Sequence, residues 1–352
     1  KGPGVDRAGD ALKHGNAYGS SPHGGVLVVA GDDHGCVSSS MPHQSDHAFV
    51  AWSMPIVQPA CVAEYLEFGL YGYQLSRFSG AWVGMAALSE VVESASTVDL
   101  DLVNARVAAW ADADTVRAAT GHRAPVDGLH YRWPDLPSLR IESRLADKLQ
   151  AVAAFARVNS IDRHVIESPR ASVGIVTCGK AHFDLMEVLR RLEVTPEALA
   201  SIGVRLYKVG LSFPIEQTRI KSFAEGLKEI LVVEEKGAIV ETQLRDLFYN
   251  APPDARPALV GKLDREGRPL VSALGELRPS RLIELVAHWL SEHFPGNAEL
   301  GNHFQHVCDF TVPELLSNDG DSVKRLPYFC AGCPHNTSTK VPQGSPARAG
   351  IG

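Results

Sequence analysis

The sequence predicts an α/β fold built on parallel sheets and divided into two successive domains. Apolar segments such as residues 25–31 and 172–178 run without alternation of polar residues, which is typical of parallel strands buried on both faces. Segments with helical periodicity separate the strands at the spacing of right-handed β-α-β crossovers. The length of 352 residues also fits two or three domains of about 150 residues each.

Composition excludes several classes of protein. The net charge is −7, with 34 basic and 41 acidic residues and no basic stripe, so we expect no nucleic-acid partner. No apolar run approaches the roughly 18 residues that cross a bilayer, and no signal peptide is present, so we expect no membrane partner. Six cysteines are too few for a disulfide scaffold. These features favour a folded protein in a reducing, cytoplasmic compartment.

The first predicted domain reads as the later half of a parallel-sheet domain. Residues 1–24, rich in Gly, His, Ser and Pro, predict a loop with one short helix. The next predicted elements are a strand at 25–31, a short strand at 56–57, an amphipathic helix at 60–78 and a strand at 82–88. The chain starts at Lys1 and stops in an apolar glycine-rich stretch, so we expect an interior piece of a longer polypeptide.

The second predicted domain comes after a long connection. Residues 99–139 predict local helix only, and a loop of that length is unusual inside one domain, so it marks a boundary. The predicted strands are at 172–178, 204–209 and 229–234. The predicted helices are at 139–158, 181–192, 239–248 and 280–290, with a short helical stretch from Pro214. Ser280 is the predicted cap of the last helix. Residues 295–352 lead into a further domain.

A polar cluster lies just after the first predicted strand. Asp32, Asp33 and His34 come directly after it, and Gln44 lies a few residues on. In open α/β sheets, ligands bind beyond the carboxyl ends of the strands, so a polar ligand is expected here. The alternative is a strand-end turn in which Asp32 caps the next segment.

Upstream, Lys13 and His14 form a second candidate site, because histidine exchanges protons near neutral pH. The alternative is that this histidine lies in a solvated loop, which is the commoner case.

Two closely spaced cysteines form the third candidate. Cys330 and Cys333 are separated by Ala331 and Gly332, and His335 lies two residues further on. Two thiolates at this spacing hold one metal or cluster from a tight turn, with the glycine allowing close backbone approach. An iron–sulfur cluster needs four cysteines, so two more ligands would come from elsewhere. A zinc site, a redox pair and two reduced cysteines in a turn remain alternatives.

Six segments together resemble a known family, the fused indolepyruvate ferredoxin oxidoreductases. Their order and spacing match along essentially the whole chain. They are Lys1-Gly-Pro-Gly-Val-Asp-Arg7, Ser21-Pro-His-Gly-Gly-Val26, Gly31-Asp-Asp-His34, Val91-Val-Glu-Ser94, Val232-Val-Glu-Glu-Lys236 and Tyr328-Phe-Cys-Ala-Gly-Cys-Pro-His-Asn-Thr-Ser-Thr-Lys-Val-Pro342.

The resemblance implies a thiamine diphosphate enzyme with Mg²⁺ and a [4Fe–4S] cluster. Such an enzyme oxidatively decarboxylates an arylpyruvate, passes the acyl group to coenzyme A and reduces ferredoxin. The implied segments are the end of a pyrimidine-binding domain (1–98), a linker (99–139), a transketolase-C-terminal-like domain (140–292), a linker (293–319) and the start of a diphosphate-binding domain (320–352). A homodimer is expected.

The resemblance also implies roles and absences. Cys330 and Cys333 would ligate the cluster, and His335 and Asn336 would lie near the cofactor. Asp32, Asp33, His34 and Gln44 would line the crevice facing it, and Lys13 or His14 would meet the substrate carboxylate.

The glutamate that activates thiamine would precede Lys1. The Gly-Asp-Gly site for Mg²⁺ and diphosphate would come after Gly352. Asn318-Asp-Gly-Asp321 resembles part of that motif, but we interpret it as a turn. Thiamine chemistry needs both, so the chain alone is expected to be inactive. A nonenzymatic zinc or redox module and an iron-free transketolase-like enzyme remain the alternatives.

Overall fold

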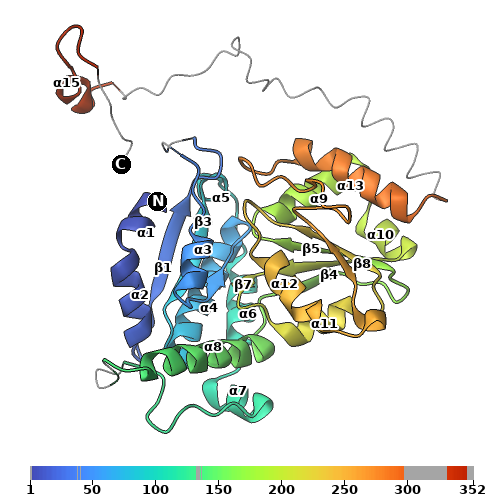
Figure 1. The fold of residues 1–352 in the computed structure, drawn as a ribbon, viewed down its shortest axis with the longest axis horizontal. Coiled ribbons are helices and arrows are strands. Elements are labelled where there is room, and N and C mark those ends of the chain that lie inside the picture. The colour runs from blue at the N-terminus through green and yellow to red at the C-terminus, as the bar shows by residue number, and fades with distance from the viewer. Residues whose placement is uncertain are drawn as a thin grey trace.

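Two β-sheets, each covered by helices on both faces, lie side by side in the computed structural model (Figure 1). The structure describes residues 2–37, 39, 41–131, 135, 137–296 and 331–346. Most strands are parallel and helices alternate with them, so the predicted α/β class is confirmed.

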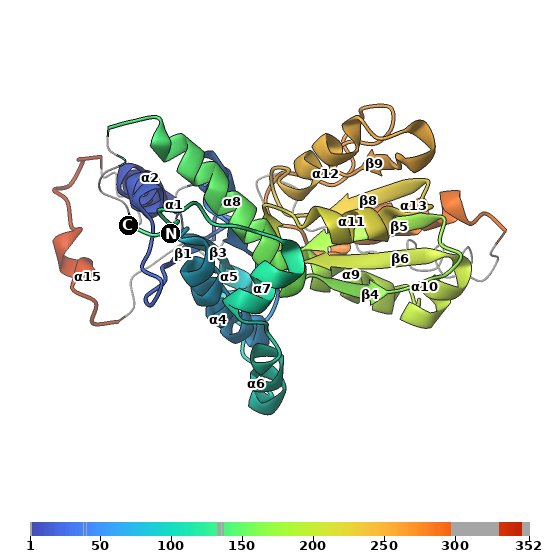
Figure 2. The same cartoon turned by 90° about the horizontal axis from the view of Figure 1, so that it is seen from below.

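The first sheet has the strand order β1-β3-β2-β7, with the first three strands parallel. Its strands are β1 (Leu27–Asp32), β2 (Ile56–Val57), β3 (Val83–Leu88) and β7 (Leu211–Phe213). One face packs against α1 (Gly2–Arg7), α2 (Gly9–Tyr18) and α3 (Asp46–Ala51), and the other against α4 (Val62–Ser79) and α8 (Arg140–Val158). The short helices α5 (Ser89–Val92), α6 (Leu100–Ala108) and α7 (Ala113–Thr120) complete this part of the chain (Figure 2).

The second sheet has the order β4-β6-β5-β8-β9, and only β4 is antiparallel to its neighbour. Its strands are β4 (Arg163–Ile166), β5 (Val173–Cys178), β6 (Val204–Val209), β8 (Glu229–Val233) and β9 (Ala258–Val260). One face packs against α9 (Ala181–Arg191), α10 (Pro196–Ile202) and α13 (Pro279–His293), and the other against α11 (Gln217–Ala224) and α12 (Val240–Tyr249). The described remainder is a 3₁₀ turn (Pro253–Ala255) and α15 (His335–Ser338).

A single extended stretch joins the two sheets. β6 belongs to the second sheet, and after Gly210 the chain continues as β7, which pairs antiparallel with β2 of the first sheet. The buried Asp162 carboxylate accepts from the backbone N–H of Gly210 at 2.7 Å and of Leu211 at 3.1 Å. A side chain at Gly210 would come within 2.9 Å of the Ile161 carbonyl oxygen, which explains the glycine.

Several predicted elements need correction. Residues 1–24 contain two helices rather than one. The last helix of the second sheet begins at Pro279 with Arg278 as its N-cap, so Ser280 is not the cap. The helix α8, placed by prediction at the start of the second domain, buries Val152 and Phe155 in the core beneath the first sheet. The predicted domain limits stay a prediction.

Candidate functional site

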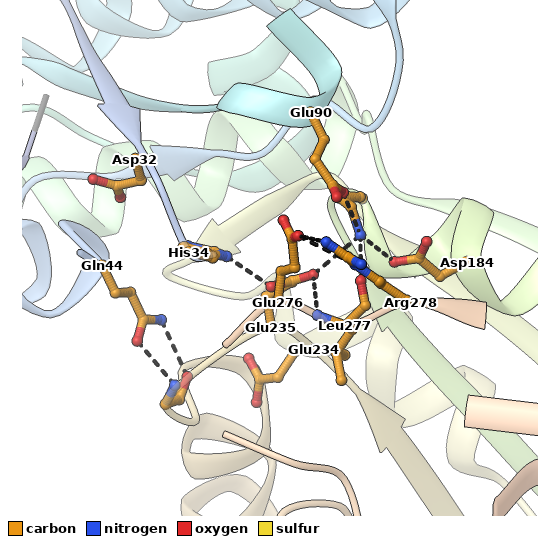
Figure 3. Close-up of polar contacts among 12 residues, drawn as sticks. Asp32, His34, Gln44, Glu90, Asp184, Glu234, Glu235, Glu276, Leu277 and Arg278 are labelled. Atoms are coloured by element: carbon orange, nitrogen blue, oxygen red, sulfur yellow. Dashed lines mark hydrogen bonds and ion pairs between the residues drawn. The ribbon is translucent and has the colours of Figure 1, made fainter. Parts of the chain in front are cut away.

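The carboxyl ends of β1 and β8 meet at a buried seam between the two sheets (Figure 3). His34 lies just beyond β1 and Glu235 just beyond β8, and His34 Nδ1 lies 2.7 Å from Glu235 Oε2. Both side chains are 6% exposed. We use "the seam" for a set of residues from both halves of the structure. Figure 3 labels Asp32, His34, Gln44, Glu90, Asp184, Glu235, Glu276 and Leu277. Lys180 and Gly237 belong to the set through their contacts with Glu235 and Gln44.

The two ring nitrogens of His34 have different surroundings. Burial by itself raises the pKa of Glu235, but the hydrogen bond from His34 and the charges of His34 and Lys180 bring that pKa below its usual value. Glu235 is therefore an ionised acceptor, and His34 Nδ1 donates to it. In the described part of the chain, His34 Nε2 is buried and has no hydrogen-bond partner. This nitrogen is the atom of the pair that is left for a bound group.

Lys180 is the cation of the seam. Its ammonium lies 2.7 Å from Asp184 Oδ2, 2.8 Å from Glu90 Oε2 and 3.4 Å from Glu235 Oε1, and it donates to the Leu277 carbonyl oxygen at 2.6 Å. Burial raises the pKa of Asp184 to about 6, although the Lys180 charge opposes the shift. One lysine thus holds together carboxylates from α5, α9 and the turn after β8.

A second contact across the seam uses an amide instead of charges. Gly237 N donates to Gln44 Oε1 at 2.9 Å, and Gln44 Nε2 donates to the Gly237 carbonyl oxygen at 3.2 Å. A Cβ at Gly237 would lie 2.6 Å from His47 Nε2, so glycine is required for this close approach. The paired hydrogen bonds lock the loop after β1 onto the loop after β8.

The two aspartates after β1 shape their own loop. The Asp32 carboxylate accepts from both the backbone N–H and the hydroxyl of Ser45, each at 2.7 Å, just before α3. Asp33 Oδ1 accepts from Val37 N at 2.9 Å. Both aspartates are buried, at 1% and 4% exposure. They hold the loop so that His34 and Gln44 face the second sheet. For Asp32 and Asp33, this is the strand-end turn that the sequence analysis gave as the alternative to a ligand site.

Asp46 is a buried carboxyl behind the seam. It accepts from Gln44 Nε2 and from Gln58 Nε2, each at 3.2 Å. Burial, assisted by the nearby charge of Asp32, raises its pKa to about 6, while the amide hydrogen bonds and His34 oppose the shift. The folded state therefore binds a proton at Asp46 more tightly than the unfolded chain does.

This pKa shift predicts a pH dependence of stability. A carboxyl with a raised folded-state pKa contributes stability below its unfolded pKa of 3.8, and that contribution is lost as the pH rises through about 6. When the pH falls from 8 to 5, Asp46 should therefore add about 1–2 kcal/mol to the free energy of unfolding of the parent. The Asp46→Asn variant should lack this contribution. Urea unfolding at both pH values measures this. The control is Asp101→Asn, at an exposed position on α6. If both variants showed the same increase in unfolding free energy between pH 8 and pH 5, the raised pKa of Asp46 would be contradicted.

Lys13 and His14 lie away from the seam. Both are on α2, at the rim of a separate pocket of about 570 Å³ between α2 and α8. Trp52, Leu145 and Leu149 provide apolar lining in that pocket. His14 Nδ1 contacts the Asp10 carbonyl oxygen at 2.8 Å within its own helix. The structure thus does not bring Lys13 and His14 to the other predicted site residues.

The predicted metal ligands are only partly described. Cys330 lies outside the described residues. Cys333 Sγ lies 3.2 Å from His335 Nδ1, and His335 and Asn336 are exposed on α15, which Figure 1 draws apart from the seam. Among the residues that the structure describes, no group of three or more His, Cys, Asp or Glu is arranged to hold a metal ion. The assignment of Cys330 and Cys333 as cluster ligands stays a prediction.

Sequence reasoning did not assign the second half of the seam. It did not single out Lys180, which is the N-cap residue of α9, or Asp184, which lies on α9. Nor did it single out Glu90. Glu235 and Lys236 were quoted only within a family segment. A signal was present, because Glu235 lies directly after a buried strand in the same way as His34 does.

Comparison with known proteins finds similarity to one family. Residues 162–280 match the family model of the indolepyruvate ferredoxin oxidoreductase middle domain. Indolepyruvate oxidoreductase subunit IorA of Pyrococcus horikoshii is 23% identical over 93% of the chain, and that of Methanothermobacter thermautotrophicus is 24% identical over 88%. The chain is thus similar to indolepyruvate ferredoxin oxidoreductases, both in this middle domain and along most of its length. It spans less than half of the length of these relatives, 46% and 43% respectively.

Solved structures give more distant likenesses. A 2-oxoglutarate:ferredoxin oxidoreductase from Magnetococcus marinus, with 2-oxoglutarate, coenzyme A and succinyl-CoA bound, aligns with a TM-score of 0.49 at 14% identity, over 83% of this chain and 52% of that one. A split-gene transketolase aligns with a TM-score of 0.37 at 12% identity, over 82% and 68%. None of the helices in the described part of the chain is long and apolar enough to span a bilayer.

Proposed function

We propose that this chain is part of an enzyme that oxidatively decarboxylates arylpyruvates such as indolepyruvate. The acyl group passes to coenzyme A, and the electrons pass through a [4Fe–4S] cluster to ferredoxin. The family match over residues 162–280 carries the proposal, and relatives named indolepyruvate oxidoreductase over about nine-tenths of the chain support it. The enzyme is expected in the cytoplasm, as a homodimer, with the remainder of the same polypeptide completing it.

Within this enzyme we assign the seam to the wall of the cofactor crevice. Thiamine diphosphate, held through Mg²⁺, supplies the decarboxylation chemistry when it is bound. The oxygens of Asp32 and Glu235 already accept hydrogen bonds from Ser45 and His34, so they position neighbours. His34 Nε2 is the seam atom with no partner among the described residues, and it fits a role in holding a proton toward a bound group. Asp33 and Gln44 fix the loop that carries it.

The cysteine segment is assigned to the electron path. Cys330 and Cys333 are proposed as two of the four cluster ligands, with His335 and Asn336 ordering the turn beside the cofactor. Lys13 and His14 are the remaining proposed contacts for the substrate carboxylate. Their place on α2, away from the seam, means that this assignment needs a second part of the enzyme to close over the pocket.

The activity is tested on the longer polypeptide, loaded with thiamine diphosphate, Mg²⁺ and iron–sulfur cluster. We expect indolepyruvate and coenzyme A together to reduce a viologen dye, while the present chain alone is inactive. Absence of dye reduction with every arylpyruvate would sink the proposal.

The cluster assignment predicts the effect of one substitution. Cys333→Ser in the longer polypeptide is expected to remove most of the brown iron–sulfur absorbance and at least about 99% of dye reduction, because three thiolates hold the cluster poorly. Cys61→Ser, at the N-cap of α4, is the matched control and should retain both. Zinc without brown absorbance would favour a nonenzymatic zinc module, and unchanged turnover in Cys333→Ser would favour an iron-free transketolase-like enzyme.

A further inference from the structure

The ring of His34 is oriented by the second sheet. Within the loop after β1, Asp32 and Asp33 accept hydrogen bonds from backbone N–H groups further along the chain, and these bonds fix the course of the backbone. The ring itself contacts Glu235, 201 residues away, with 2.7 Å between His34 Nδ1 and Glu235 Oε2. The direction in which the imidazole points therefore depends on a residue that follows β8 (Figure 3).

Both carboxylate oxygens of Glu235 are held in place. Oε2 contacts His34, while Oε1 accepts from the backbone N–H of Leu277 at 3.0 Å and lies 3.4 Å from the Lys180 ammonium. The side chain is 6% exposed, so protein groups satisfy these oxygens in place of water. Glu235 cannot turn away from His34 without losing its contacts to Leu277 and Lys180.

The contact between these two side chains has its proton on His34. Burial raises the pKa of Glu235, but the hydrogen bond from His34 and the charges of His34 and Lys180 bring it below its usual value. An ionised carboxylate has no hydrogen to donate. His34 Nδ1 therefore keeps a proton toward Glu235 whether the ring is neutral or charged.

Proton exchange by His34 is thereby confined to Nε2. A neutral imidazole carries a proton on one nitrogen and a charged imidazole carries one on both. Because Nδ1 is protonated in both forms, the second proton comes and goes at Nε2. In the described part of the chain, Nε2 is buried and has no hydrogen-bond partner. Buried polar atoms are nearly always hydrogen-bonded, so this nitrogen is available to a group that the enzyme binds.

Carboxylates surround His34 on several sides. Burial raises the pKa of Asp46 to about 6, and the charge of His34 opposes that shift. A Cβ at Gly35 would lie 2.9 Å from Glu276 Oε1, which also accepts from Arg278. The charged groups around the ring, among the described residues, are Asp32, Asp33, Asp46, Glu235 and Glu276, the cations Lys180 and Arg278, and Glu90 and Asp184 behind Lys180. A positive charge that forms on the ring thus meets carboxylates that are already in place.

We propose that Glu235 is a positioning residue of the proposed reaction, which acts by holding His34 so that Nε2 accepts a proton from a bound N–H, O–H or S–H group. In this step the bond between the proton and the bound atom breaks, its electron pair stays on the bound atom, and an N–H bond forms at Nε2. The proton then returns to the bound group or passes to water, which discharges the ring. Lys180 supports the arrangement by holding Glu235 Oε1.

The inference gives the middle of the chain a part in proton transfer. Glu235 and Lys180 both lie within residues 162–280, the range that matches the middle-domain model, whereas His34 follows β1 of the first sheet. The inference rests on the proposed function. It adds the chemical class of the group that meets His34, which is a hydrogen-bond donor of the reactant and not a carboxylate or phosphate oxygen.

The proton positions are measured by solid-state ¹⁵N NMR of the longer polypeptide with labelled histidine rings. Signals that disappear in His34→Gln belong to His34. From about pH 5 to about pH 9, we expect His34 Nε2 to change from protonated to unprotonated while Nδ1 stays protonated. In Glu235→Gln the side-chain amide can donate to Nδ1, so part of the neutral ring should carry its proton on Nε2 instead. A proton change at Nδ1 in the parent, no change at either nitrogen, or an unaltered Nδ1 proton in Glu235→Gln would each overturn the proposal.

Turnover gives a second measurement on the same polypeptide. Glu235→Gln should lower the kcat of dye reduction by about 100-fold or more, the usual contribution of one acid–base group, and leave the KM for indolepyruvate unchanged. Glu284→Gln, at an exposed position on α13, is the matched control and should keep the kcat of the parent. Equal kcat values for the two variants would overturn the inference and leave the proposed function standing. A parent that reduces no dye, yet shows the expected proton positions, would contradict the proposed activity and leave the assignment of Nε2 standing.

Discussion

Replacing Lys208 by methionine is expected to lower the free energy of unfolding by about 3–5 kcal/mol. Lys208 on β6 forms an ion pair with Glu64 on α4, and both residues are 3% exposed. The ammonium also lies 5.9 Å and 5.8 Å from the ring centroids of Phe68 and Phe183. Removing one partner of a buried pair leaves an uncompensated charge out of water, which is the costly case. Urea unfolding of the chain measures the loss.

A double variant separates the pair from simple packing. Glu64→Gln combined with Lys208→Met removes both charges, so it should be more stable than Lys208→Met alone. Arg268→Met removes a surface cation that pairs with Asp264 and should change stability far less. If Lys208→Met were no more harmful than Arg268→Met, the buried pair would not contribute to joining the two sheets.

Replacing Lys180 by methionine is expected to cost about 3 kcal/mol at neutral pH and less in acid. Asp184 and Glu235 would lose their cation in a buried site, and the Leu277 carbonyl would lose its donor. The pKa of Asp184 is already raised to about 6 by burial, and loss of the lysine charge would raise it further. A protonated carboxyl needs no cation, so the deficit should shrink as the pH falls from 8 to 5.

The comparison with a matched lysine makes this result specific. Lys228→Met removes an exposed lysine from the same half of the chain and should cost little at either pH. Unfolding curves at pH 5 and pH 8 for the parent and both variants give the required differences. A deficit for Lys180→Met that grows toward low pH would contradict the arrangement of charges described for the seam.

The strands and helices that the sequence predicted well are those with strong local patterns. β6 spans the predicted residues 204–209, and β5 starts one residue later than predicted. The elements that were missed depend on distant partners. β7 has three residues, one of them Ser212, and it becomes a strand only because β2 pairs with it.

The first two helices show the same limit in another way. α1 and α2 contain glycines that locally disfavour a helix. Close packing explains two of the glycines in α2, since a Cβ at Gly15 would lie 2.2 Å from the ring of Trp82 and one at Gly9 would lie 3.0 Å from that of Trp52. A segment that composition describes as a loop is therefore a helix in close contact with two indoles, and its glycines serve that contact.

The candidate site was predictable in one half only. The rule that ligands gather at the carboxyl ends of parallel strands led from the residues to Asp32, His34 and Gln44, and these do lie together. Lys13 and His14 were a separate candidate, chosen because histidine exchanges protons near neutral pH, and they line a separate pocket. The partner of His34 is Glu235, 201 residues away, and local pattern carries no information about such a separation.

The sequence by itself determined the α/β class, most strand positions and the family that the chain resembles, because apolar runs, turn residues and ordered motifs are properties of neighbouring residues. Only the tertiary structure decided that β7 ties one sheet to the other, and that Lys180 and Glu235 face His34. These features arise where residues far apart in the chain are brought into a site that excludes water, and there the cost of an unpaired charge sets the arrangement.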